Sequence, residues 1–287
     1  MIAHVAEATE ARGRVIVRTT SARASDIAMQ AAVQIAQAYR SEIESLYIED
    51  TELIALSRFS FVREISAFGG KSRPLTPGIV VRDLRNQFAG LQRRLEQLAG
   101  AAQVPIRERF VRDDPLRALA VTCADCGPWN VVVLTEPFGG SSGGDIAQVL
   151  DNVEDATGLV LVGPRASRTQ GPVVMVLEDI DALSGMIRAG DRLIETSGAP
   201  LVLAIIGADG DTSEWIEQQA RLALGNRSDL HLVHLALNHA EPALAAEAIR
   251  RMAPGFVIAR FGGLAVPAAD DLSPLAAGLE CPVLLSR

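Results

Sequence analysis

The side chains best suited to chemistry are few and lie far apart in this chain. Cys123 and Cys126 form a C-x-x-C pair, the spacing of redox dithiols and of half a zinc site. A redox pair usually begins a helix, where the dipole lowers a thiol pKa, but the apolar pattern places this pair at the end of a helix over 115–124. Cys281 and the four histidines are not spaced to complete a zinc site. We therefore predict structural, buried cysteines and no metal site.

A second candidate, Gly69-Gly70-Lys71-Ser72, resembles the end of a phosphate-binding P-loop. The motif needs a glycine five residues before Gly70, where Ile65 stands, and a following helix, where Pro74 and Pro77 stand. We interpret the segment as an ordinary Gly/Pro loop. Lys71 is also the only lysine of the chain, so lysine-dependent chemistry has one candidate.

Hydrolase patterns are missing as well. The sequence contains no Gly-x-Ser-x-Gly elbow. Asp113-Asp114 precede a helical pattern that begins at Pro115, so we interpret them as capping residues. His231 and His234 are three residues apart on one expected strand, and strand alternation points them to opposite faces. We find no catalytic constellation and predict that the protein is not an enzyme.

The bulk composition limits the partners. The chain of 287 residues is 48% hydrophobic and carries a net charge of −8, which argues against nucleic acid and anionic membrane surfaces as partners. The sequence contains no run of 18 apolar residues, so we expect no membrane span. The start of the chain lacks the apolar core of a signal peptide. Three cysteines, an odd number, favour a reducing compartment, and we expect a cytoplasmic protein.

Short β-branched runs alternate with helical patterns, and the order occurs twice. The first set spans residues 12–163 and the second 171–287, with a Pro/Gly/Arg/Ser stretch over 163–171 between them. Expected strands cover 15–17, 43–48, 104–111, 130–134, 159–162, 173–177, 201–206, 230–237, 256–260 and 283–285. Expected helices cover 25–39, 84–98, 115–124, 146–153, 182–194, 214–224, 243–252 and 272–277. This order predicts an α/β, Rossmann-like fold with two tandem open parallel five-stranded sheets, each with helices on both faces.

The chain resembles the universal stress protein superfamily in a tandem form. The resemblance rests on Val15-Ile16-Val17, the helix that follows, the strand ending in Glu49-Asp50, and the closing Cys281-Pro282-Val283-Leu284-Leu285. It implies that the two halves form a pseudo-dimer that meets near 159–162 and 283–285. It also implies a nucleotide crevice at the carboxyl ends of the strands, where the strand order reverses.

The residues of that crevice are incomplete in both halves. In the family an acidic residue ends the first strand, and a Gly-x2-Gly-x9-Gly-Ser/Thr stretch follows the fourth. In the first half Thr20 takes the acidic position, Gly140 and Gly143 fit Gly-x2-Gly, and Val153-Glu154 replace the closing pair. In the second half Glu178-Asp179 keep the acidic end, but Gly262-Gly263 lead into no phosphate loop. We therefore expect neither tight ATP binding nor hydrolysis. ATP or AMP binding through Thr20, Gly140 and Gly143 stays open as the alternative.

One segment, 51–78, has no counterpart in the second half. It holds three of the eight phenylalanines, Phe59, Phe61 and Phe68. Either it packs over its own sheet, or it forms a docking surface or a lid. The preferred interpretation of the whole chain is a non-catalytic, stress-associated or regulatory protein that works through contacts with a partner protein or with itself, through these phenylalanines. The alternative is a nucleotide sensor.

Overall fold

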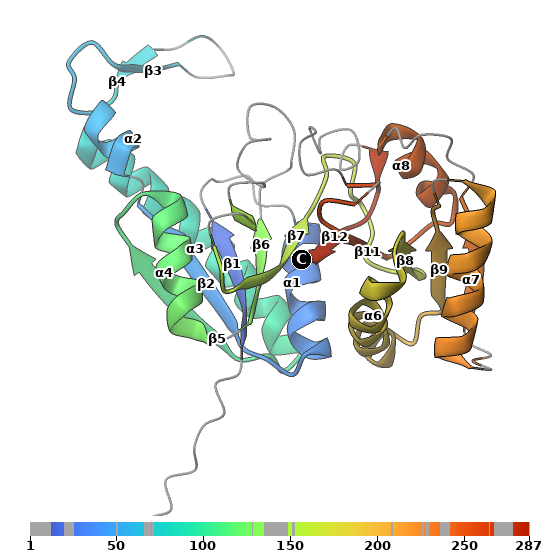
Figure 1. The fold of residues 1–287 in the computed structure, drawn as a ribbon. Helices are drawn as coiled ribbons and strands as arrows, with labels where there is room; N and C mark the ends of the chain where they lie inside the picture. The colour runs from blue at the N-terminus through green and yellow to red at the C-terminus, as the bar shows by residue number, and fades with distance from the viewer. Residues whose placement is uncertain are drawn as a thin grey trace, which may run out of the picture.

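The protein contains one continuous ten-stranded β-sheet with helices on both faces (Figure 1). This computed structural model describes residues 13–19, 26–49, 51–65, 70, 72–127, 129–134, 149–150, 153–207, 209–225, 227, 230–235, 242–263, 265–266 and 278–286. The strand order is β10-β9-β8-β11-β12-β7-β6-β1-β2-β5. A separate hairpin, β3-β4, lies outside the sheet.

The bounds of the strands follow the apolar runs of the sequence. They are β1 (Arg14–Thr19), β2 (Ile43–Ile48), β3 (Arg63–Ile65), β4 (Ser72–Pro74), β5 (Ile106–Val111), β6 (Asn130–Leu134), β7 (Ala156–Leu161), β8 (Val173–Leu177), β9 (Leu201–Ile205), β10 (Leu230–His234), β11 (Phe256–Arg260) and β12 (Val283–Ser286). The central strands β2, β6, β8 and β9 are buried along their whole length, as expected for parallel strands covered on both faces. The residues of the two edge strands, β5 and β10, are all partly buried or exposed.

The expectation of two separate sheets is corrected by the pairing of β7 with β12. These two strands, the last of each half, run antiparallel, with Leu161 opposite Val283 and Leu159 opposite Leu285. All other neighbours in the large sheet are parallel. The predicted contact between the ends of the halves is therefore confirmed, and its consequence is one sheet. An edge strand has backbone N–H and C=O groups without hydrogen-bond partners. The edge strands of the two halves join because each one provides partners for the other.

The helices are distributed over the two faces of the sheet. Their bounds are α1 (Asp26–Ala38), α2 (Thr51–Leu56), α3 (Pro77–Ala101), α4 (Pro115–Cys126), the 3₁₀ helix η1 (Ile180–Ala182), α6 (Leu183–Ser197), α7 (Gly210–Leu224) and α8 (Pro242–Arg251). One core contains residues of α1, α3, α6 and α7, and the other contains residues of α4 and α8. Each core includes strand residues from both halves, so the two halves share their hydrophobic interior.

The helix ends show why these segments are helical. Asp114, as predicted, caps α4 by accepting hydrogen bonds from the backbone N–H groups of Leu116 and Arg117, with Pro115 at the first position. The α6 helix ends at Gly198 in the left-handed conformation, with a φ of 65°. The α3 helix is longer than the predicted span 84–98, because Pro77 starts it two turns earlier.

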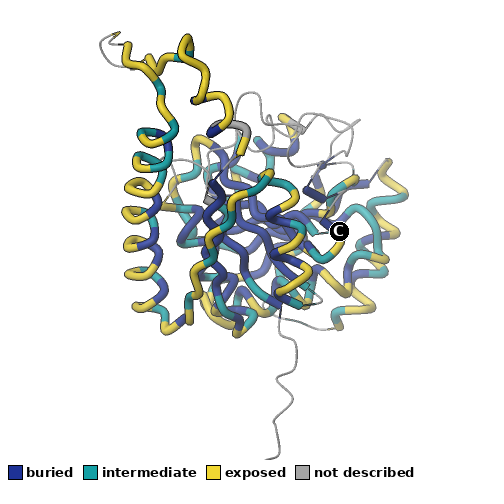
Figure 2. The backbone as a smooth tube through the Cα atoms, turned by 90° about the vertical axis from the view of Figure 1, so that its left-hand side faces the viewer, coloured by how far each residue is buried: buried dark blue, intermediate teal, exposed yellow. Residues whose placement is uncertain are grey.

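The insert forms an arm, defined here as residues 51–65 and 72–76, that stands beyond the N-terminal end of α3 (Figures 1 and 2). Ile54 and Ser57 are buried, and Arg73 of β4 forms an ion pair with Asp83 of α3 at 2.6 Å. The hairpin residues that the structure describes are exposed. The arm does not pack over its sheet, so that interpretation of the insert is wrong for the residues described. Phe68 lies outside them.

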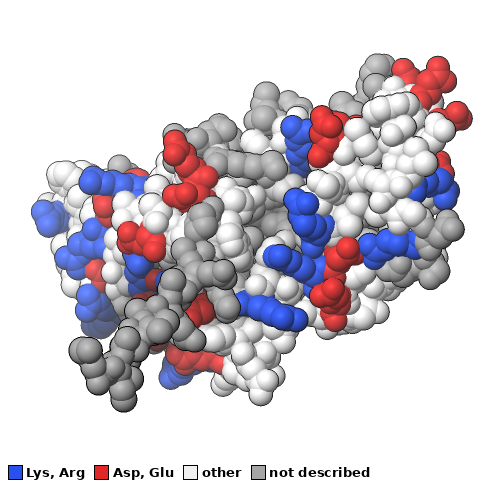
Figure 3. Space-filling model, turned by 60° about the horizontal axis from the view of Figure 1, so that its bottom comes forward, with Lys and Arg blue, Asp and Glu red and all other residues white. Residues whose placement is uncertain are grey.

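Two surface properties bear on partners. Among the described residues, no helix combines the length and the apolarity that a membrane span requires. On the face shown in Figure 3, acidic and basic side chains lie beside one another rather than forming an area of one sign. The described residues on this face therefore form no basic patch for a nucleic-acid backbone.

Candidate functional site

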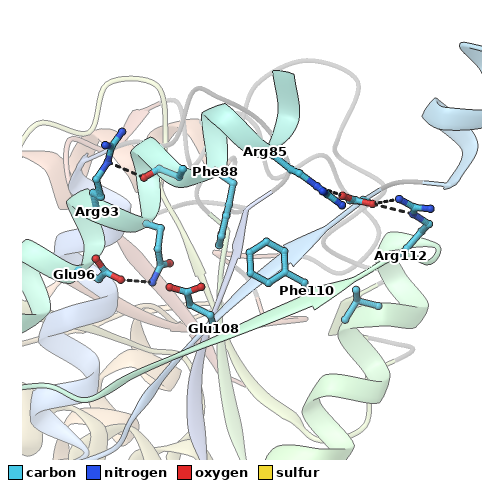
Figure 4. Close-up of a pocket in the computed structure, with 11 residues that line it drawn as sticks. Arg85, Phe88, Arg93, Glu96, Glu108, Phe110 and Arg112 are labelled. Carbon is cyan, nitrogen blue, oxygen red and sulfur yellow. Dashed lines mark hydrogen bonds and ion pairs between the residues drawn. The ribbon is translucent and has the colours of Figure 1, made fainter. Parts of the chain in front are cut away.

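A groove of about 900 Å³ runs between α3 and the edge strand β5 (Figure 4). Its walls are Glu49 at the end of β2, residues of α3 from Arg85 to Glu96, and residues of β5 from Glu108 to Arg112. It exists because α3 crosses the sheet near its edge and covers β5 incompletely, so that Phe110 remains 57% exposed. Its volume lies within the range of about 300–1,000 Å³ that is typical of small-molecule sites.

One end of the groove carries two arginines on a single buried carboxylate. Glu49 accepts a hydrogen bond from Arg85 Nε at 2.8 Å through one oxygen and from Arg112 Nε at 2.9 Å through the other. Burial raises the pKa of Glu49, but the hydrogen bonds from Arg112 and Arg85 outweigh it and leave that pKa below its ordinary value. The three groups together carry one positive charge, and Figure 4 shows both guanidinium groups reaching the same carboxylate.

The middle of the groove is aromatic. The rings of Phe88 and Phe110 pack edge to face with centroids 5.0 Å apart, and Tyr47 of β2 packs against Phe88 at 4.6 Å. Tyr47 is buried, and among the described residues its hydroxyl has no hydrogen-bond partner. Burial, together with the charge of Glu49, raises the pKa of Tyr47 to about 12 although Arg85 opposes the shift. The tyrosine is therefore a neutral donor beside the arginine end.

The other end of the groove is acidic. Glu96 and Glu108 line it, and Arg93 donates to the carbonyl of Ala89 rather than to either carboxylate. The side chain of Gln92 is already used, since it accepts from the hydroxyl of Ser45 at 2.7 Å and donates to Glu96 at 3.1 Å. The groove thus has a cationic end, an aromatic middle and an anionic end.

The crevice of the second half lies where the strand order reverses, beside β8 and β11, and it is small. A cavity of about 270 Å³ there is lined by Glu178, Asp179, Arg260 and Gly263 among others. Glu178 accepts a hydrogen bond from the backbone N–H of Ala265 at 2.6 Å, and Asp179 pairs with Arg260 at 3.3 Å. A Cβ atom at Gly263 would lie 2.0 Å from a carboxylate oxygen of Glu178, so glycine permits this close approach. The backbone N–H of Ala265 is therefore occupied by the Glu178 carboxylate and does not face a phosphate group.

The predicted first-half crevice falls outside the described residues. This holds for Thr20, Gly140 and Gly143, and likewise for Lys71. The nucleotide alternative through these residues stays a prediction.

The cysteines lie where the sequence placed them. Cys123 and Cys126 are buried in the last turns of α4, and Cys281 is buried before β12. Burial raises the pKa of the Cys123 and Cys281 thiols to about 12 and also raises that of Cys126. No group of three or more potential metal ligands occurs in the described ranges. His234 instead contacts Glu217 of α7.

We expect all three thiols to resist iodoacetamide in the folded protein at about pH 8. A thiol with a pKa near 12 is ionised in only about one molecule in ten thousand at that pH, and burial blocks access as well. Mass spectrometry should show labelling only after denaturation. Rapid native labelling of Cys126, the thiol nearest to Arg14 and Arg109, would show that this pair is reactive after all.

The groove was missed in the sequence because its residues are far apart along the chain. Glu49 is 36 positions from Arg85 and 63 from Arg112. A signal did exist: Glu49 and Arg112 each directly follow a strand, and the carboxyl ends of neighbouring parallel strands meet at one edge of the sheet.

Comparison of the fold with solved structures agrees with the resemblance seen in the sequence. The chain is similar to a universal stress protein from Archaeoglobus fulgidus, with a TM-score of 0.58 and 12% identity over 97% of each chain. It is also similar to a putative universal stress protein from Pseudomonas aeruginosa, with a TM-score of 0.55 and 12% identity over 96% of this chain and 92% of that one. A third similar structure is the cytoplasmic domain of a prokaryotic cation chloride cotransporter, with a TM-score of 0.59 and 12% identity over 96% of this chain and 95% of that one.

The comparisons define a class of fold and no more. No protein-family profile matches the sequence, and no curated protein matches it either. The structure is an α/β fold of the universal-stress-protein type, with a sheet that is mainly parallel.

Proposed function

We propose that this protein is a non-catalytic, stress-associated or regulatory protein of the cytoplasm, and that its arm is the surface that contacts a partner protein or a second copy. The observation that carries the proposal is the exposure of neighbouring apolar side chains on the arm. Phe61 is 78% exposed, Ile65 is 71% exposed, and Leu56 and Phe59 are each about half exposed. Single exposed apolar residues are common, but a group of four on one projection marks a contact surface.

The construction of the arm supports the same function. Phe59 and Phe61 stack on each other with centroids 5.5 Å apart, so the rings form one apolar face instead of packing into a core. Arg73 holds the hairpin in place by pairing with Glu64 of β3 and with Asp83 of α3. An ordered projection presents its side chains at less entropic cost than a floppy loop would. One fold can support many functions, so the proposal rests on the arm and not on the fold.

Replacing Phe59, Phe61 and Ile65 together with serine should abolish self-association or partner capture and leave the fold intact. These side chains are exposed, so the free energy of unfolding should change by about 0.5 kcal/mol or less per site. Sedimentation velocity over a range of concentrations measures self-association, and capture with the tagged protein identifies a partner.

The matched control replaces three apolar residues exposed on the second half, Trp215, Leu222 and Leu244, with serine. It should leave both association and capture unchanged. Unfolding of the arm variant would show that the arm is part of a core. Equal loss in both variants would show that the effect is general and not a property of the arm.

A further inference from the structure

The groove between α3 and β5 is a second feature, separate from the arm and independent of what the arm contacts. We propose that it is a binding site for a small organic anion with a flat, apolar or aromatic body. Neither the resemblance in the sequence nor the similar structures assign a ligand to this place, which lies away from the strand-order reversals at β1/β6 and β8/β11.

The arginine end supplies the anion site. Arg85 uses its Nε, and Arg112 its Nε and one terminal nitrogen, to bond Glu49. In the described part of the chain the other N–H groups of both side chains have no partner. The two arginine side chains are about 60% exposed, whereas the side chain of Glu49 is 7% exposed, so a buried carboxylate orients two exposed arginines. The two planar donor groups lie on opposite sides of the Glu49 carboxylate, and their free N–H groups suit a carboxylate, sulfonate or phosphate group.

The Tyr47 hydroxyl lies near the same end, under the aromatic rings and not among the residues that line the groove. It is buried, it has no partner in the described ranges, and the charges of Glu49 and Arg85 both act on it. Buried hydroxyl groups nearly always have a hydrogen-bond partner.

The rest of the groove defines the body of the ligand and its direction. Phe88 and Phe110 form an apolar wall beside the arginines. Phe110 is 57% exposed because α3 covers β5 incompletely, so an apolar ligand can contact its ring. The volume of about 900 Å³ lies in the range of small-molecule sites, roughly 300–1,000 Å³. Glu96 and Glu108 outnumber Arg93 at the other end, which leaves that end negatively charged, so the anionic group of the ligand is placed at Arg85 and Arg112 and its apolar body along the rings.

Addition of a peptide strand fits the site less well. The free edge of β5 carries three consecutive charged residues, Arg107, Glu108 and Arg109, and Arg107 and Arg109 are paired with carboxylates of their own sheet or of α4. Charged edge strands resist pairing with another strand. A small molecule lies on the α3 side of β5 and does not need that edge.

The test uses 1-naphthyl phosphate as the probe, because it combines a flat aromatic body with an anion. Isothermal titration calorimetry should show saturable binding at one site. Inorganic phosphate, which lacks the body, and 1-naphthol, which lacks the anion, should each bind at least about tenfold more weakly. Wild-type binding no tighter than that of inorganic phosphate would overturn the proposal.

Single substitutions locate the probe. Arg85→Gln and Arg112→Gln each leave one arginine on Glu49, and Phe110→Ser changes an exposed side chain, so all three variants should fold. Each should weaken the probe about tenfold. Arg94→Gln is the matched control on the same helix, and it should change the affinity less than about twofold because Arg94 pairs with Asp26 and does not line the groove.

Two further measurements complete the test. Tyr47→Phe keeps the ring and removes a buried hydroxyl that does not line the groove, so it should change the affinity for the probe less than about twofold and leave the urea midpoint unchanged or higher. If a second copy covers the groove instead, the apparent affinity will fall as the protein concentration rises. That result, or an unchanged affinity in both arginine variants, would overturn the proposal.

Discussion

Replacing Leu285 with alanine is expected to lower the free energy of unfolding by about 3 kcal/mol and to destabilise both halves of the protein together. Leu285 is fully buried on β12, and it faces Leu159 of β7 across the antiparallel junction. Truncating a buried leucine typically costs about 2–5 kcal/mol, because the cavity left behind does not close. The core that contains Leu285 also contains residues of α4 and α8, one from each half, so its loss is felt on both sides.

The two tryptophans allow the halves to be followed separately. Trp129 precedes β6 in the first half and Trp215 lies on α7 in the second, and they are the only two in the chain. Urea unfolding of Trp129→Phe and Trp215→Phe backgrounds, each with and without Leu285→Ala, should give coincident transitions that shift together.

The control for this experiment is Leu222→Ala, which truncates a leucine that is 72% exposed on α7. It should change the free energy of unfolding by about 0.5 kcal/mol or less. Two well-separated transitions in the wild-type backgrounds would show that the continuous sheet does not couple the halves.

Glu44→Ala is expected to cost about 2–4 kcal/mol, the second large effect. Glu44 of β2 is buried, and its carboxylate accepts hydrogen bonds from Arg14 of β1 at 2.7 Å and from Arg109 of β5 at 2.9 Å. Removing one member of a buried ion pair costs about 3–5 kcal/mol when the other charge stays buried. The lower figure applies here because both arginines keep some contact with water.

A close neighbour provides the matched control. Glu42 lies two residues away and also pairs with two arginines, Arg107 at 2.8 Å and Arg14 at 3.7 Å, but its side chain is about a third exposed. Glu42→Ala should therefore cost about 1 kcal/mol or less. Urea denaturation at neutral pH measures both variants. Equal costs would mean that burial of the carboxylate does not set the strength of these pairs.

Local features of the fold could be predicted well from the sequence. The predicted strands, the capping of α4 by Asp114 and the placement of Cys123 and Cys126 at the end of that helix are confirmed. These features depend on residues close together in the chain, whose side-chain period and capping groups are visible in sequence. The expected short helices near 146–153 and 272–277 lie mostly outside the described residues.

The candidate groove could not be predicted in the same way. Arg85, Phe88 and Arg112 gave only helical or strand periodicity, which is equally typical of an ordinary amphipathic element. Their meeting at Glu49 depends on where α3 crosses the edge of the sheet, and a surface of this kind has no short motif. Phe110 occupies the alternating position of an inward strand residue and is nevertheless more than half exposed, because β5 is an edge strand.

The sequence by itself determined the α/β class and the repeated order of elements, and the family resemblance implied the contact between the closing strands at 159–162 and 283–285. Only the tertiary structure decided that this contact joins ten strands into one sheet, because the number of sheets depends on which backbone edges meet. It also decided that the insert stands away from the body with Phe59 and Phe61 exposed. An apolar run gives the same pattern in a core and on a contact surface, and only the surrounding chain determines which of the two it becomes.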